Sequence, residues 1–291
     1  MNKQERSSEL ILNDDGSVYH LKLFPEQVAD TVITVGDPGR VEQVSRHFDV
    51  IEYEGTKREF VTHTGLIGKK RITVISSGIG PDNIDIVLNE LHILASRDLT
   101  TGNLLEKPRS LNIIRLGTSG TICEDIEVDS TIVSKAAFGL DNLLHFYHPT
   151  GNAAYQEMAD SLQAHCSFPS MIRPYYFEAD NNLLSRFSKW PLHGITLTAP
   201  GFYGPQGREV NLPNAIPDLI GKLRTFRHGT ERITNIEMES AAIFGLASHL
   251  GHHALSVNVI LANRATGQFS NQAPASVKRL ISEALETICS Q

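Results

Sequence analysis

The sequence predicts an α/β fold: a three-layer single domain in which helices flank a central, mainly parallel but mixed sheet. Short runs of valine, isoleucine and leucine recur along the chain and are nearly continuous, as in strands buried on both faces. Segments with helical patterns of apolar residues lie between or after these runs. Hydrophobic residues make up 41 % and charged residues 20 % of the 291 residues, an ordinary globular composition. We therefore expect one domain over residues 1–291.

The expected strands are β-branched, apolar runs. They are Thr31–Val35, Arg71–Ser76, Leu111–Leu116, Ser130–Ser134, Gly194–Thr198 and Ala254–Leu261. The expected helices are Val41–Phe48, Asn83–Ser96, Ala154–Cys166, Asn181–Ser188, Ile236–Leu250 and Ala275–Cys289. Two stretches, Asn142–Asn152 and Pro200–Pro217, fit neither pattern. The second is rich in glycine and proline, and long irregular loops in compact domains are often functional.

The composition argues against several classes of protein. A net charge of −7 argues against broad binding of nucleic acid through its phosphates, but it does not forbid a basic pocket for a small anion. The three cysteines are odd in number and far apart, which favours a reducing compartment without a zinc motif. No apolar run approaches transmembrane length. We expect a cytoplasmic protein with neither a membrane nor a nucleic-acid partner.

The segment Asn235–Ala242 places two acids where an apolar helix is expected to begin. Glu237 and Glu239 would point about 200° apart on a helix, so they cannot share one role. Thr234 stands at capping-box spacing before Glu237, which is therefore expected to cap the helix. Glu239 is left to face a cavity, where its carboxylate could accept hydrogen bonds from hydroxyl groups. The alternative is a second acid that complements the helix dipole.

A glycine-rich turn after the first expected strand predicts an anion site. In Gly36-Asp37-Pro38-Gly39-Arg40, the glycines bring backbone amides close together, and the following helix start offers unpaired N–H groups. Arg40 in the first helical turn opposes the helix dipole at a cost of ~0.3–1 kcal/mol, which a bound anion would offset. The alternative is a solvated surface arginine.

A second candidate anion-binding segment is Arg115-Leu116-Gly117-Thr118-Ser119-Gly120. Arg115 interrupts the end of an apolar strand, where a charge is costly unless it is paired. The glycines and hydroxyls that follow suit a loop that binds oxyanions at the carboxyl end of a strand. The alternative is an arginine paired with a buried acid. A third candidate is Arg58, in Lys57-Arg58-Glu59-Phe60, but this charged run by itself favours a solvated face.

Five motifs occur in the same order in the nucleoside phosphorylase-I family, which the chain resembles from about His20 to Arg264. They are Gly36–Arg40, Arg58–Phe60, Gly78–Gly80, Arg115–Gly120 and Glu237–Ser240. Within the family the chain is most similar to the uridine-cleaving branch, because Phe202 and Tyr203 are followed by Gln206 and Arg208. The resemblance implies a nucleoside phosphorylase-like fold and at least a homodimer with shared active sites.

The resemblance also implies a role for each matching position. Phosphate would be bound by Gly36, Arg40, Arg58, Arg115 and Thr118. The ribose would be held by His20, Met238 and Glu239, and the base by Phe202, Gln206 and Arg208. Arg58 and His20 would reach the site of the neighbouring subunit. The expected catalytic residues are Arg115, Arg208, Gln206 and Glu239.

The implied reaction is phosphorolysis of uridine, with deoxyuridine and thymidine as further candidates, to uracil and (deoxy)ribose 1-phosphate. Inorganic phosphate is the co-substrate, and neither a metal nor an organic cofactor is needed. A hexameric branch of the family binds a monovalent cation such as potassium through a site that includes the position of Glu59. The turn Gly80-Pro81-Asp82 is one glycine shorter here, which weakens that expectation.

Three alternatives stay open. A purine nucleoside phosphorylase or a hydrolytic nucleosidase could share the fold, but such branches carry an aspartate near the position of Asn263-Arg264. Hydrolysis, moreover, needs no cluster of arginines to hold an anion. A catalytically silent nucleoside-binding protein is opposed by the joint presence of phosphate, sugar and base residues. The sequence leaves open the preferred sugar, the choice between dimer and hexamer, and a role in salvage or breakdown.

Overall fold

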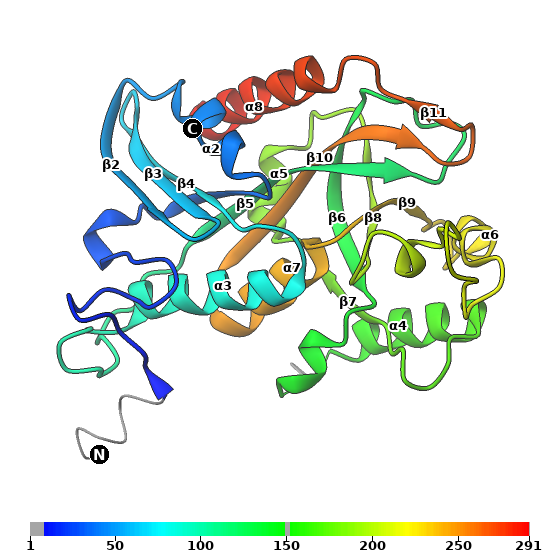
Figure 1. Cartoon of the computed structure of the whole chain (residues 1–291), viewed down its shortest axis with the longest axis horizontal. Helices are drawn as coiled ribbons and strands as arrows, with labels where there is room; N and C mark the ends of the chain where they lie inside the picture. Colours follow the sequence, from blue (N-terminus) through cyan, green and yellow to red (C-terminus); the bar gives the residue numbers. More distant parts are fainter. Residues whose placement is uncertain (1–8, 149–151, 291) are drawn as a thin grey trace.

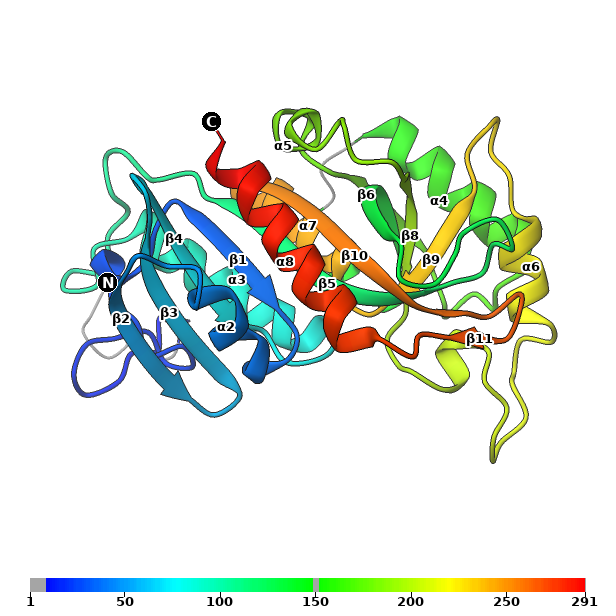
Figure 2. The ribbon, with the colours of Figure 1, turned by 90° about the horizontal axis from the view of Figure 1, so that it is seen from above.

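The fold is built on a large mixed sheet with helices on both faces (Figure 1). The computed structural model describes residues 9–148 and 152–290. The strands are β1 (Thr31–Val35), β2 (Val50–Lys57), β3 (Phe60–Ile67), β4 (Lys70–Ser76), β5 (Asn112–Thr121), β6 (Thr131–Gly139), β7 (Tyr175–Glu178), β8 (His193–Thr198), β9 (Ile233–Glu237), β10 (His253–Asn263) and β11 (Gln268–Phe269). The α-helices are α2 (Pro38–Ser45), α3 (Pro81–Ser96), α4 (Ala153–Cys166), α5 (Asn181–Arg186), α6 (Leu219–Thr225), α7 (Ser240–Leu250) and α8 (Ala273–Cys289). Helices α2 and α8 cover one face, and α3 and α7 cover the other (Figures 1 and 2). The predicted α/β class with flanking helices is confirmed.

The sheet closes on itself at one end. Strand β5 pairs with β9, β9 with β8, β8 with β6, β6 with β10, and β10 again with β5. Strands β1, β4, β3 and β2 extend outward from β5 as an open sheet. The pairs β1–β4, β1–β5, β5–β10, β6–β8 and β8–β9 are parallel, and the outer pairs β2–β3 and β3–β4 are antiparallel. This closed ring of strands, β5, β9, β8, β6 and β10, was not predicted from the sequence.

Every expected strand and helix overlaps an observed one, but several observed elements have no counterpart among the predictions. Strand β2 lies at the sheet edge, is largely exposed and carries Glu52 and Glu54, so it lacks the apolar run that marked the other strands. Strands β3, β7, β9 and β11 and helix α6 were also missed. Short edge and ring strands depend on tertiary pairing more than on their own composition.

The predicted start of the helix Ile236–Leu250 is wrong. Residues Ile233–Glu237 form β9, and α7 begins only at Ser240. Thr234 does not cap a helix, since its hydroxyl donates to the carbonyl oxygen of Ile195 at 3.0 Å. The pairing of β9 with β8 and β5 extends this segment and overrides the local capping signal.

The expected loop after Arg115 is also wrong, because β5 continues through the glycine-rich segment to Thr121. Its residues pair in parallel with β10 along this length, with Gly117 opposite Asn258. Of the two unassigned stretches, one contains the short 3-10 helix η2 (Leu143–Phe146), and its residues 149–151 lie outside the described residues. The other, Pro200–Pro217, holds only the 3-10 turn η3 (Gly204–Gln206).

The sheet is buried from both sides by apolar side chains. One core cluster joins the open sheet to α2, α3, α7 and α8, and a second packs the ring strands against α4 and α6. None of the helices in residues 9–148 and 152–290 combines the length and apolar character needed to cross a membrane.

Candidate active site

A cavity of about 750 Å³ lies where β1, β5 and β9 end and the Pro200–Pro217 loop folds over them. Nine of the residues that the sequence singled out line it. They are Gly36, Arg40, Arg115, Thr118, Phe202, Gln206, Arg208, Met238 and Glu239. The carboxyl ends of parallel strands are the usual place for a ligand in such sheets. The structure therefore gathers residues from Gly36 to Glu239, far apart in the chain, into one cavity.

The anion-binding end of the cavity is built by Arg40 and Arg115. Asp37 caps α2 by accepting from the backbone N–H of Gly39 at 2.9 Å, and the Arg40 side chain reaches back to the carbonyl oxygen of Leu116 at 3.2 Å. Burial and the nearby charge of Arg115 lower the pKa of Arg40. Two guanidinium groups that repel each other at one end of a cavity favour an anion between them.

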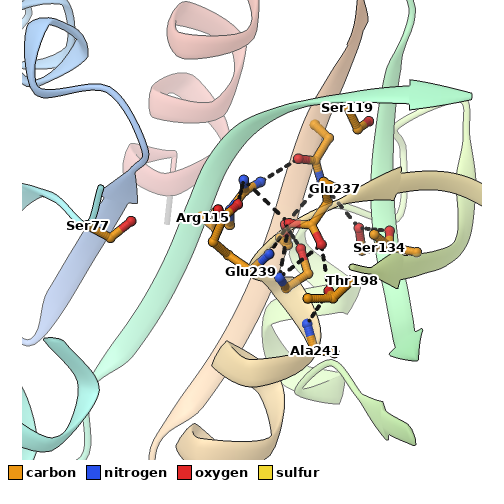
Figure 3. Close-up of polar contacts among 12 residues, drawn as sticks. Ser77, Arg115, Ser119, Ser134, Thr198, Glu237, Glu239 and Ala241 are labelled. Atoms are coloured by element: carbon orange, nitrogen blue, oxygen red, sulfur yellow. Dashed lines mark hydrogen bonds and ion pairs between the residues drawn. The ribbon is translucent and has the colours of Figure 1, made fainter. Parts of the chain in front are cut away.

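Arg115 is buried and pairs with acids on β9 and at the start of α7. Its Nη2 donates to Glu239 Oε2 and lies 3.4 Å from Glu237 Oε2 (Figure 3). Its Nη1 donates to Asn258 Oδ1 at 2.5 Å. Burial alone would lower the pKa of Arg115, but Glu239 and Glu237 raise it. The alternative that Arg115 pairs with a buried acid is thus correct, and Arg115 also lines the cavity.

The two glutamates have different roles, but not for the reason expected from helical spacing, because Glu237 ends β9 and Glu239 precedes α7. Glu237 is bonded entirely within the protein: it accepts from Thr198 Oγ1 at 2.6 Å and from the backbone N–H groups of Glu239 and Ser240 at 3.0 Å (Figure 3). These bonds give acceptors to backbone N–H groups at the start of α7, and the acceptor residue is the last one of β9, the strand before that helix. Glu237 therefore has a structural role, although by a different geometry from the expected capping box, and it also lines the cavity.

Glu239 stands at the junction of the anion-binding end and the middle of the cavity. Its Oε1 accepts from the backbone N–H of Gly80 at 2.8 Å, and its Oε2 accepts from Arg115. Burial raises the pKa of Glu239; Arg115 acts in the opposite direction, and Glu237 adds to the rise. Met238 lines the cavity beside it and is half-buried. A carboxylate in this setting can accept hydrogen bonds from ligand hydroxyls.

The opposite end of the cavity is built by the Pro200–Pro217 loop. Gln206 is buried, and its Oε1 accepts from Arg208 Nη1 at 2.7 Å. The Arg208 guanidinium lies 3.8 Å from the ring centre of Phe202 and donates to its backbone carbonyl. Burial lowers the pKa of Arg208. An amide, a guanidinium and an aromatic ring together suit a flat heterocycle with carbonyl oxygens.

Several residues that shape the site were not singled out by the sequence. Asn258 holds Arg115, and its only sequence signal is an amide inside an otherwise apolar strand. Arg264, which follows β10 and entered the sequence analysis only through the segment Asn263-Arg264, donates to the backbone carbonyl of Gln206 and so supports the loop. Ile79 and Phe269, both largely exposed, add apolar surface to the cavity. Isolated apolar residues in turns and short strands carry no pattern that could have identified them.

Arg58 and His20 lie outside this cavity. Arg58 is exposed in the turn between β2 and β3, with φ = 55°. His20 lies before η1 (Pro25–Gln27), where its Nδ1 is 2.7 Å from Glu90 Oε1. Their assignment to the site of a neighbouring subunit stays a prediction.

In the described part of the chain, histidine, cysteine and carboxylate side chains nowhere gather in groups of three or more that could hold a metal ion. Glu59, the candidate cation ligand, lines the cavity from the turn that also carries Arg58.

The chain has relatives among known proteins. A family model described as the phosphorylase superfamily matches residues 30–289. The uridine phosphorylase of Thermococcus kodakarensis is 29 % identical over 97 % of this chain and 90 % of its own length. A DeoD-type purine nucleoside phosphorylase of Bacillus cereus is 26 % identical over 94 % of this chain and 99 % of its own length.

The comparison of structures gives the same fold. A crystal structure of Trypanosoma brucei nucleoside phosphorylase, described as showing uridine phosphorylase activity, superimposes with a TM-score of 0.88 and is 30 % identical. The alignment covers 97 % of this chain and 100 % of that chain.

Proposed function

Because the chain belongs to the phosphorylase superfamily, we propose that it cleaves uridine with inorganic phosphate to give uracil and ribose 1-phosphate. The observation that carries the proposal is a single cavity lined by two arginines, a buried glutamate and the Gln206–Arg208 pair. The uridine phosphorylase of Thermococcus kodakarensis and the Trypanosoma brucei enzyme support the choice of substrate.

In the proposed reaction a phosphate oxygen attacks the anomeric carbon of the ribose while the glycosidic C–N bond breaks. The electron pair of that bond moves onto uracil, and positive charge develops on the sugar. Arg40 and Arg115 hold the phosphate dianion, since both line the same end of the cavity. This mechanism relies on positioning and electrostatics and needs no covalent intermediate.

The leaving base is stabilised by the loop residues. Arg208 donates to a carbonyl oxygen of uracil as negative charge builds on the ring, and the Gln206 amide pairs with the N3–H and a carbonyl oxygen. Phe202, which already lies against Arg208, packs on the face of the base. This set of donors and acceptors is what makes uracil the preferred base in the proposal.

The ribose is held in the middle by Glu239 and Met238. Glu239 keeps its bond to the Gly80 N–H and accepts from sugar hydroxyls with its other oxygen, so that binding energy from the sugar is applied to the reacting bond. Thr118 and the backbone at Gly36 complete the phosphate end.

The proposal includes a second copy of the chain. Arg58 and His20 lie outside the cavity of their own chain, and each would enter the cavity of a partner, Arg58 towards phosphate and His20 towards the ribose. At least a homodimer is then needed for activity. The proposal also places the enzyme in the cytoplasm, where uridine cleavage would serve pyrimidine salvage or breakdown.

A panel of nucleosides assayed with and without inorganic phosphate tests the proposed function. We expect uridine to be cleaved only when phosphate is present, with ribose 1-phosphate as a product. Faster cleavage of inosine or adenosine than of uridine would favour a purine phosphorylase, and cleavage without phosphate would favour a nucleosidase. Binding of uridine without any turnover would favour a silent binding protein.

A further inference from the structure

Strand β10 carries an asparagine in the middle of a buried apolar run. Asn258 stands between Val257 and Val259, and its side chain is fully buried. A buried amide is costly unless both of its ends are hydrogen-bonded. Its Oδ1 accepts from Arg115 Nη1 at 2.5 Å, and its Nδ2 donates to Ser256 Oγ at 3.1 Å. This satisfied amide is directed at the arginine of the proposed phosphate site.

The backbone opposite Asn258 leaves room for this contact. Asn258 faces Gly117 in the parallel pairing of β5 and β10. A Cβ atom at Gly117 would lie 1.7 Å from Arg115 Nη1 and 2.5 Å from Asn258 Oδ1. The space that a side chain would fill at this position is thus occupied by the guanidinium and its amide partner. The glycine and the asparagine form one arrangement around Arg115.

The remaining contacts of Arg115 lie on its other terminal nitrogen. Nη2 faces Glu239 and Glu237 (Figure 3). Nη1 faces Asn258. Because a guanidinium is planar, fixing both terminal nitrogens fixes the plane of the group. Without the amide, two carboxylates on one side would be free to draw the guanidinium towards themselves and away from an anion. The amide is uncharged, so it orients Arg115 without adding negative charge to an anion site.

Asn258 is also connected to the helix that begins beside Glu239. Ser256 Oγ, which accepts from Asn258, is 2.8 Å from Ser240 Oγ in the first turn of α7. The Asn258 amide therefore bridges Arg115 and the start of that helix through one hydroxyl. The side chains of Asn258, Ser256 and Ser240 are fully buried, whereas that of Arg115 also lines the cavity.

We propose that Asn258 is a positioning residue for phosphorolysis, which sets the plane of Arg115 so that its guanidinium faces the phosphate. The inference rests on the proposed function, because it concerns the phosphate end of the same cavity. Asn258 touches no substrate in this scheme and acts only through Arg115.

The test uses Asn258→Leu and Asn258→Ser, both of which remove the acceptor for Arg115. Leucine is similar in size to asparagine, and serine keeps a hydroxyl that can bond to the buried neighbours. If the leucine variant does not fold, the serine variant is used to test the role of Asn258. The matched control is Thr121→Val, which removes buried bonds to the backbone of Thr234 and Cys123 in the same ring and contacts neither Arg115 nor the hydrogen-bond partners of Asn258. The measurements are the KM for phosphate, the KM for uridine, and the rise in melting temperature caused by phosphate alone.

We expect the Asn258 variants to raise the KM for phosphate roughly tenfold, as loss of a hydrogen bond to a charged group does, and the KM for uridine by less than about twofold. Phosphate should also stabilise them less than it stabilises the wild-type protein. Thr121→Val should lower the melting temperature without changing the KM for phosphate. An unchanged KM for phosphate in the Asn258 variants, or an equal rise in both KM values, overturns the positioning role.

The result is distinct from a failure of the proposed function. If the wild-type chain neither cleaves uridine with phosphate nor gains stability from phosphate, the proposed function fails, and the role of Asn258 fails with it. If the wild-type chain does both and the Asn258 variants match it, only the positioning role is wrong.

Discussion

At the scale of single residues, Arg208 is oriented by its own loop. Its guanidinium lies on the Phe202 ring and donates to the Gln206 side chain at 2.7 Å. Arg208→Ala should lower kcat/KM for uridine by roughly 10²-fold, because a preorganised donor to the leaving base is lost, while the KM for phosphate stays unchanged. Arg208→Lys should restore little, since an ammonium has no plane to lie on the ring. An unaltered substrate profile in Arg208→Ala would count against the base-binding role.

His252 makes the stability of the fold depend on pH. It is buried, its Nδ1 accepts from the Leu111 backbone N–H at 3.2 Å, and its Nε2 lies 3.2 Å from His92 Nδ1. Burial, with the charges of His92 and His253, lowers the pKa of His252 to about 4. The folded state therefore holds the neutral ring, whereas the unfolded chain takes up a proton near pH 6.5. With respect to this group, the free energy of unfolding has its full value above about pH 6.5 and decreases as the pH falls towards 4.

We expect the free energy of unfolding to drop by about 2 kcal/mol between pH 7.5 and pH 5 through this group. His252→Asn, whose Oδ1 can accept from Leu111 in place of the ring nitrogen, should remove that part of the dependence. His193→Asn, at an exposed position, is the control and should keep it. Urea unfolding at the two pH values measures the difference, and an equal drop in His252→Asn and the wild-type protein would contradict the assignment.

The sequence identified some site residues and not others for a physical reason. Arg115 was found because a charge in an apolar strand signals a partner or a ligand, and here it has partners in Glu239 and Asn258. Asn258 was overlooked because an uncharged amide in such a strand is a weaker signal. Its role depends on which residue faces it across β5 and β10, and strand register cannot be read from either strand alone.

At the scale of elements, the glycine-rich end of β5 shows how a strand can carry a site. Gly117→Ala would place a methyl group 1.7 Å from Arg115 Nη1, so the guanidinium must leave its position. We expect the variant to lose about 1–3 kcal/mol of unfolding free energy and to bind phosphate poorly. Gly120→Ala, in the same strand, would meet only ordinary contacts at 3.6 Å and 3.8 Å and should change stability little. Equal stability of the two variants in chemical unfolding would contradict this account.

The junction of β9 and α7 shows where local patterns mislead. Threonine, glutamate and an apolar run predicted a helix from Ile236, yet the chain stays extended through Glu237 because β8 and β5 supply pairing partners. The carboxylate that was expected to cap from inside the helix instead bonds the helix start from the strand. Composition identified the α/β class and the buried strands, but the pairing that closes the ring depends on contacts between distant segments.

At the scale of the whole molecule, the prediction of a shared site can be tested with mixed subunits. Arg58→Ala and Arg115→Ala should each be inactive alone, because one removes a group donated to the partner and the other a group in the chain's own cavity. Random exchange between them should restore about a quarter of the wild-type activity, since half of the dimers are mixed and each has one intact site. The control mixes Arg115→Ala with Arg208→Ala, which alter the same cavity, and should restore none. Absence of recovery in the first mixture would argue against sharing.

The closed ring of strands also bears on how the chain is made. Strand β10 joins β5 to β6, yet it is synthesised after the four other strands of the ring. A nascent chain that has emerged only as far as α7 still lacks Asn258 and the pairing that encloses Arg115. Contacts between such distant segments fold slowly, and until β10 arrives the neighbouring strand edges are open to mispairing. Ribosome-bound chains that end before His253 should therefore be the most dependent on chaperones.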